Sequence, residues 1–287
     1  MIFRKSIVTV LVAFAAVASV FAHDAKRQSK WAKLDGSKIH YYDIGKTKQK
    51  KALVLIHGWT CSADFWKESF DAFPDYRILA IDLPGHGQSE KPKVDYSMAY
   101  FARAVDAVMK QAGVKSAVLV GHSMGTPVAR EFYRLHPQQT LGIVVVDGAL
   151  QSFFPKAMME QFIAQLRTNY KESAPKMVDG MLAPIKDAGL KKMIRDSMLA
   201  TPDYVGISAM DGMADEKIWT TDKINVPVLA IMAASPVWPS DLKERYMSIA
   251  PKMEFQVWTD VSHFLFMEKP KEFNEQVRAF VSKNKLL

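Results

Sequence analysis

The sequence contains a single cysteine, Cys61, among its 287 residues. One thiol cannot form a disulfide within the chain, so a disulfide-stabilised scaffold is excluded, and Cys61 is expected to be a small buried hydrophobic residue. The chain also lacks a phosphate-binding glycine loop, any set of residues with metal-ligand spacing, and any repeat or low-complexity segment. These absences lead us to expect no metal and no cofactor.

The positive charge of the chain does not have the pattern of a nucleic-acid surface. The formal net charge is +8, and the densest basic group is Lys46, Lys48, Lys50 and Lys51. Aromatic or arginine residues would alternate with lysines in a nucleic-acid surface, and none does here. We therefore expect no nucleic-acid partner. With 49% hydrophobic and 24% charged residues, the composition is typical of a globular protein with a sizeable core.

A long hydrophobic run is present only at the N-terminus. Arg4 and Lys5 precede an apolar segment over residues 7–22, which ends in Val20-Phe21-Ala22. This layout is typical of a secretory signal peptide, here residues 1–22 with cleavage after Ala22. The alternative is an uncleaved anchor, but the run is short for a span of about 20 residues. We predict a secreted or periplasmic protein with no stable membrane span after cleavage.

Beyond the signal peptide, short apolar segments alternate with segments of helical spacing. Trp31 to Asp43 is expected to form a hairpin with Asp35-Gly36 as its turn. Alternating strands and helices predict an α/β fold with a mostly parallel central sheet flanked by helices. The expected strands are 52–56, 77–81, 117–120, 143–146, 226–233 and 254–258, and the expected helices are 97–112, 126–135 and 270–283.

The interval between Val146 and Val226 is too long for one crossover helix. We therefore predict an inserted helical cap over residues 150–223, with the core formed by residues 23–149 and 224–287. The cap has eight of the 16 methionines, most of which should pack its interior while a minority line a pocket for an apolar substrate group. They are Met158, Met159, Met177, Met181, Met193, Met198, Met210 and Met213.

Gly121-His122-Ser123-Met124-Gly125 follows an expected strand and precedes an expected helix. A Gly-x-Ser-x-Gly sequence in that context is typical of a nucleophile elbow, a sharp turn that exposes a serine hydroxyl. Side chains at positions 121 and 125 would collide with the neighbouring strand or helix, which explains the glycines. An ordinary strand-to-helix loop is the alternative, but the context favours Ser123 as a nucleophile.

A serine nucleophile needs a base that takes its proton, and His263 is the best candidate. It follows the last expected strand, so it lies at the same edge of the sheet as Ser123. For His122 we expect the backbone position to matter more than the ring. The remaining histidines lie in the N-terminal region, beside turn glycines or at a helix end: His23, His40, His57, His86 and His136.

Four motifs occur in the order seen in the α/β-hydrolase superfamily: His57-Gly58-Trp59, the segment from Asp82 to Ser89, the elbow, and the segment from His263 to Pro270. The chain resembles the cap-bearing esterase branch, which shares its framework with epoxide hydrolases and dehalogenases. The resemblance covers Trp31 to the C-terminus except the cap. It implies that the oxyanion hole is formed by the backbone amides of Trp59 and Met124.

The position of the acidic residue that would orient the histidine departs from the common pattern of that family. The loop after the penultimate strand, residues 234–239, has no carboxylate. Asp147, which follows the strand after the elbow helix, is our preferred acid, as in some relatives. Asp241 and Asp260 stay open as alternatives, because all three preserve the order Ser, Asp, His along the chain.

Serine at the elbow argues against epoxide hydrolase and dehalogenase chemistry, which uses a carboxylate nucleophile in the related families. We predict an exported serine hydrolase that cleaves a carboxylic ester with an apolar portion through an acyl-enzyme, using Ser123, His263 and Asp147. A lactone or carbon–carbon bond hydrolase would use the same residues. A ligand-binding protein on a hydrolase scaffold is the alternative from another class. Exact substrate, oligomeric state and physiological role stay open.

Overall fold

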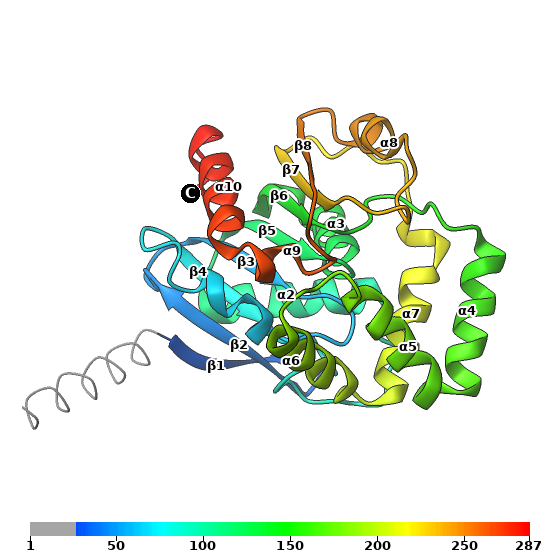
Figure 1. The fold of residues 1–287 in the computed structure, drawn as a ribbon. Coiled ribbons are helices and arrows are strands. Elements are labelled where there is room, and N and C mark those ends of the chain that lie inside the picture. The colour runs from blue at the N-terminus through cyan, green and yellow to red at the C-terminus, as the bar shows by residue number, and fades with distance from the viewer. Residues whose placement is uncertain (1–26) are drawn as a thin grey trace, which may run out of the picture.

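The computed structural model describes residues 27–287, so the predicted signal peptide and its cleavage after Ala22 lie outside the described residues. Eight strands form one sheet: β1 (Arg27–Leu34), β2 (Ser37–Gly45), β3 (Lys51–Ile56), β4 (Arg77–Ile81), β5 (Ser116–His122), β6 (Thr140–Val146), β7 (Val228–Ala233) and β8 (Met253–Trp258). Their order is β1-β2-β4-β3-β5-β6-β7-β8 (Figure 1).

The sheet is antiparallel only at one edge, where β2 pairs with β1 and with β4, and every other neighbouring pair is parallel. β4 and β7 are buried along their whole lengths, and β3 at every position but its first. Parallel strands covered on both faces are apolar throughout, which is why these segments read as unbroken hydrophobic runs. The predicted mostly parallel sheet is confirmed.

The predicted hairpin is also confirmed, with Leu34 paired to Ser37 across the turn. Asp35 and Gly36 have φ values of 49° and 85°. Two successive residues with positive φ are the signature of a type I′ turn, whose twist matches that of the strands it joins. This turn sets the register that places the side chains of β1 beside those of β2.

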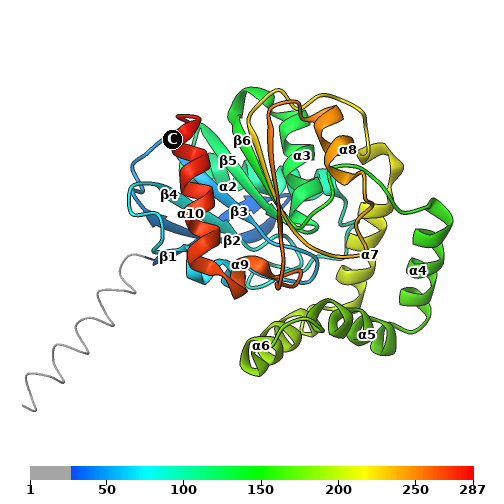
Figure 2. The same cartoon turned by 45° about the horizontal axis from the view of Figure 1, so that its top comes forward.

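Helices cover both faces of the sheet (Figures 1 and 2). α2 (Met98–Ala112) and α3 (Gly125–Leu135) lie on one face, and α10 (Pro270–Lys283) lies on the other. The Ser97 hydroxyl accepts a hydrogen bond from the Tyr100 amide and caps α2, as the start of the predicted helix requires. The shorter helices are η1 (Ala63–Ser69), η2 (Pro137–Gln139), η3 (Glu216–Ile218), α8 (Leu242–Ile249) and α9 (Leu265–Glu268).

Four helices between β6 and β7 form the segment that we call the helical insertion: α4 (Lys156–Thr168), α5 (Tyr170–Leu182), α6 (Ala188–Leu199) and α7 (Asp203–Ala214). They gather on one side of the molecule, away from α10 (Figure 1). Met198 and Met210 are buried, whereas Met158 is 53% exposed. The division into a core and a cap over residues 150–223 stays a prediction. Within residues 27–287, no helix is both long and apolar enough to cross a membrane.

The two elbow glycines lie where the chain has no room for a side chain. A Cβ atom added to Gly125 would lie 2.3 Å from the Ile56 carbonyl oxygen, and one added to Gly121 would lie 2.4 Å from the Gly125 carbonyl oxygen. Real Cβ atoms do not approach backbone oxygens so closely, so the start of α3 can pack against the end of β3 only with glycine at these positions.

Gly125→Ala should therefore destabilise the protein by about 1–3 kcal/mol, because the backbone of β3 or α3 must shift to admit the methyl group. Gly180, in α5, is the matched control, since a Cβ added there would meet nothing within 4 Å. Gly180→Ala should instead stabilise by about 0.5–1 kcal/mol. Urea denaturation measures both changes, and equal stability of the two variants would contradict the packing argument.

Candidate active site

The residues predicted to form the site follow different strands but lie at one edge of the sheet. Trp59 follows β3, Ser123 follows β5, Asp147 follows β6 and His263 follows β8. These strands are parallel, so their carboxyl ends lie together, and loops at that edge are where open α/β sheets bind ligands.

Ser123 occupies the sharp turn between β5 and α3. Its φ is 52°, a left-handed conformation that is uncommon for a residue with a side chain. Its amide donates to the Val146 carbonyl at 3.0 Å, and its carbonyl accepts from the Thr126 amide at 2.9 Å. Backbone strain of this kind is concentrated at functional sites. The half-buried Ser123 hydroxyl makes no hydrogen bond within the described part of the chain, and catalytic hydrogen bonds often tighten only when substrate binds.

His263 and Asp147 are in direct contact, with 2.6 Å between Nδ1 and Oδ2. The other carboxylate oxygen, Oδ1, accepts from the Ala233 amide at 2.8 Å and from Trp238 Nε1 at 3.0 Å. Because an ionised carboxylate can only accept, Nδ1 of His263 carries a proton directed at Asp147. In the neutral ring, Nε2 is then the unprotonated nitrogen, the one that a general base needs.

The two alternative acids lie elsewhere. Asp241 is exposed at the start of α8, where its Oδ1 accepts from Arg245 Nε at 2.8 Å. That hydrogen bond lowers the pKa of Asp241. Asp260 is exposed. Neither carboxylate is hydrogen bonded to His263, so the structure brings only Asp147 to the histidine.

Trp238 is a member of the site that the sequence analysis did not identify. It lies in the loop after β7, where the resemblance led us to expect an acidic residue and residues 234–239 have none. Its indole N–H instead donates to the carboxylate of Asp147, the residue that directly follows β6. The only sequence feature that pointed to Trp238 was the absence of a carboxylate from the loop in which it lies.

The side chain of His122 also has a role at this site, although the sequence analysis expected its backbone position to matter more than its ring. Its ring Nε2 lies 2.9 Å from the His263 carbonyl oxygen, and the two rings are 4.7 Å apart between centroids. Phe266 packs on the same ring at 4.8 Å. Burial lowers the pKa of His122 well below its usual value, so the ring is neutral and donates from Nε2. The ring therefore supports the loop of His263.

Trp59 and Met124 have free backbone amides, as the oxyanion hole requires. Both residues are buried, and neither amide donates a hydrogen bond within residues 27–287. Unpaired buried N–H groups are rare in proteins, so two beside one serine are a notable feature. Gly58 places the Trp59 loop close to the elbow, because a Cβ at Gly58 would lie 3.0 Å from the Ser123 Cβ.

The indole Nε1 of Trp59 donates to the Gly206 carbonyl on α7 at 2.7 Å, which joins this loop to the helical insertion.

Metal ligation has no support among the described side chains, since no group of three or more His, Cys, Asp or Glu could hold an ion there. Cys61 is buried, and burial raises the pKa of its thiol.

Comparisons with known proteins agree with this architecture. Residues 51–190 match the family model described as alpha/beta hydrolase fold. The 2-hydroxy-6-oxononadienedioate/2-hydroxy-6-oxononatrienedioate hydrolase of Paraburkholderia phymatum is 27% identical over 265 residues, which cover 85% of this chain and 91% of that protein. The structure of the esterase RhEst1 from Rhodococcus sp. ECU1013 superposes with a TM-score of 0.74 at 25% identity and covers 90% of this chain and 98% of its own.

A further relative shares only part of its length with this chain. The dihydrolipoyllysine-residue acetyltransferase component of the acetoin cleaving system of Cupriavidus necator is 34% identical over 125 residues, or 43% of this chain. The chain spans 33% of the length of that protein.

Three buried histidines near the site predict sensitivity to acid. Burial lowers the pKa of His57 and of His122, and lowers that of His86 to about 3. In the unfolded chain these rings take up protons near pH 6.5, so below that pH the unfolded state binds more protons than the folded state and the free energy of unfolding falls. Three protons correspond to a loss of up to about 4 kcal/mol per pH unit.

Urea denaturation between pH 7.5 and 5 measures this dependence. His122→Gln should make the slope shallower by about one proton, or ~1.4 kcal/mol per pH unit. A free energy of unfolding that stays constant over this range would contradict the assignment of three neutral rings.

Proposed function

The chain belongs to the α/β-hydrolase superfamily and is a hydrolase, and on that premise we propose that it is an exported serine hydrolase that cleaves carboxylic esters with an apolar portion. The observation that carries the proposal is the 2.6 Å contact between His263 Nδ1 and Asp147 Oδ2, at the sheet edge where the strained Ser123 lies. Export rests on the signal-peptide pattern of residues 1–22.

In the proposed reaction, Ser123 Oγ attacks the ester carbonyl carbon while His263 Nε2 takes the hydroxyl proton. Asp147 keeps the ring in the tautomer that exposes Nε2 and stabilises the imidazolium that forms. The amides of Trp59 and Met124 donate to the developing oxyanion. The proton on His263 then goes to the leaving alcohol, and a water molecule activated by the same nitrogen releases the acid from Ser123.

An apolar substrate group is supported by the side chains around this edge of the molecule. Phe153 packs against Trp238 with 4.9 Å between ring centroids, and Trp59 lies 6.5 Å from Tyr170 of α5. Aromatic side chains with few polar groups are typical of pockets for small apolar molecules.

A carbon–carbon bond hydrolase is the second candidate. The Paraburkholderia phymatum relative is named as a hydrolase of 2-hydroxy-6-oxononadienedioate, and it covers most of this chain. The same three residues would serve, since the serine or a water molecule activated by the histidine would add to the ketone carbon.

Hydrolysis of a series of p-nitrophenyl esters of increasing acyl length tests the first proposal. Ser123→Ala should reduce kcat by about 10⁶-fold, and Asp147→Asn by about 10⁴-fold because the amide favours the wrong histidine tautomer. Asp241→Asn is the matched control and should leave kcat unchanged, because that carboxylate contacts only Arg245 among the described side chains.

Wild-type rates no higher than those of Ser123→Ala on every ester would overturn the esterase proposal. The carbon–carbon candidate is then tested with a vinylogous 1,5-diketone. Stoichiometric labelling of Ser123 by a fluorophosphonate without turnover of either substrate would indicate a ligand-binding protein.

Trp238→Phe tests the contribution of the indole N–H to Asp147. Phenylalanine keeps the ring against Phe153 but removes one hydrogen bond to a charged group, worth about 1.5–3 kcal/mol. We expect kcat to fall by about 10- to 100-fold at constant KM, because the loss of this donor leaves the carboxylate that orients His263 less firmly held. Trp219→Phe is the control, since Trp219 donates to the Met213 carbonyl instead. A kcat equal to that of the Trp219→Phe variant would show that Trp238 only fills space.

A further inference from the structure

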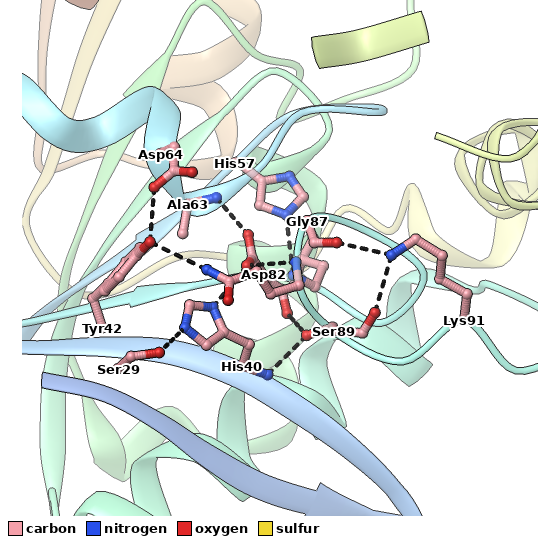
Figure 3. Close-up of polar contacts among 12 residues, drawn as sticks. Ser29, His40, Tyr42, His57, Ala63, Asp64, Asp82, Gly87, Ser89 and Lys91 are labelled. Carbon is pink, nitrogen blue, oxygen red and sulfur yellow. Dashed lines mark hydrogen bonds and ion pairs between the residues drawn. The ribbon is translucent and has the colours of Figure 1, made fainter. Parts of the chain in front are cut away.

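A second serine, histidine and aspartate are in contact where the first hairpin packs beside the end of β4. Ser29 Oγ on β1 lies 2.6 Å from His40 Nε2 on β2, and His40 Nδ1 lies 2.7 Å from Asp82 Oδ2, directly after β4 (Figure 3). None of these residues belongs to the site described above. β1 is four strands from β5 in the sheet, or roughly 19 Å at about 4.8 Å per strand.

Asp82 is held as an ionised acceptor. Its Oδ1 accepts from the Ala63 amide at 2.7 Å, and its Oδ2 accepts from the Gln88 amide at 2.9 Å as well as from His40. Burial alone would raise its pKa, but the hydrogen bonds from His40 and from these two amides outweigh burial and hold the pKa of Asp82 below its usual value.

The direction of the proton follows from that charge. An ionised carboxylate cannot donate, so His40 carries its proton on Nδ1 and presents an unprotonated Nε2 in the neutral ring. The Ser29 hydroxyl must then donate to Nε2. This is the arrangement of donors and acceptors that activates a serine in a hydrolase.

The histidine is fixed and the serine is accessible. The His40 ring is fully buried, with Trp31 packed on it at 5.1 Å and Tyr42 at 4.8 Å between centroids. Ser29, in contrast, is exposed. Trp31 is 44% exposed and also lines a surface hollow of about 480 Å³, together with Ala32, Lys33, Lys38, Gln88 and Glu90. Ser29 and Trp31 are two residues apart on β1, so their side chains lie on the same face of the strand, and an acyl donor with an aromatic leaving group could stack on Trp31 near the hydroxyl.

We propose that Ser29 is a second nucleophilic serine, activated by His40 and Asp82, that accepts acyl groups from small activated esters and phosphonyl groups from fluorophosphonates. In the acyl transfer, Ser29 Oγ forms a bond to the ester carbonyl carbon and its proton passes to His40 Nε2. The bond to the aryloxide breaks, the proton goes to the departing aryloxide, and the acyl group stays on Ser29. With a fluorophosphonate, Ser29 Oγ forms a bond to phosphorus, the P–F bond breaks and fluoride leaves, while the serine proton stays on His40.

The test uses the Ser123→Ala protein, in which the first site cannot react. After exposure to a small fluorophosphonate, peptide mass spectrometry follows adducts on Ser29 and, as an internal control, on the exposed Ser240. General-base assistance predicts a Ser29 rate about 10²- to 10⁴-fold above that of Ser240. With p-nitrophenyl acetate, the same protein should release one equivalent of p-nitrophenol in a burst that Ser29→Ala abolishes.

His40→Gln supplies the decisive variant, because glutamine can bridge Ser29 and Asp82 but cannot take the serine proton. Labelling of Ser29 should fall to the rate of Ser240, while Ser123 in the His40→Gln single variant should still be labelled if the fold is intact. Equal labelling of Ser29 and Ser240 in Ser123→Ala would overturn the proposal, whether or not His40→Gln folds. Undiminished Ser29 labelling in a folded His40→Gln variant would do the same.

Discussion

The Asp147 carboxylate is hydrogen bonded to two segments that are far from it in the sequence. The first is β7 with the loop that follows it, through the Ala233 amide and Trp238, and the second is the loop after β8, through His263. Burying a carboxylate costs free energy of folding unless the group is paired and fully hydrogen bonded, so Asp147 can be buried here only because these donors are present. The same contacts orient the histidine. The same hydrogen bonds thus support the fold and orient the histidine that we propose as the base.

Close packing beneath the elbow supplies the other half of the site. Glycine at 121 and 125 lets α3 begin against the end of β3, which brings the Trp59 loop beside Ser123. The helical insertion holds the same loop from the opposite side, since Trp59 Nε1 donates to the Gly206 carbonyl and Thr201 Oγ1 donates to the Thr60 carbonyl at 3.1 Å. The proposed oxyanion donor is therefore positioned by the core and the insertion together.

Particular residues show which features of the fold and of the site could be predicted from the sequence. The Asp35-Gly36 turn and the apolar strands were recognisable because their signals are local. The first is an Asp-Gly pair, whose two residues have positive φ in the structure, and the second is an unbroken run of five or six apolar residues. Trp238 was missed because a tryptophan in a loop has many roles. The role of the His122 ring was missed for another reason, since its contact with the His263 carbonyl depends on packing between segments that no local pattern specifies.

The sequence by itself determined the order of strands and helices, the elbow and the identity of the groups available for chemistry, because periodicity, glycine placement and residue type are local properties. It also limited the acid to a few aspartates. Only the tertiary structure decided which of these meets a histidine. Side-chain hydrogen bonds form over about 3 Å between segments separated by a hundred residues or more, and the relative position of such segments follows from the packing of the whole sheet.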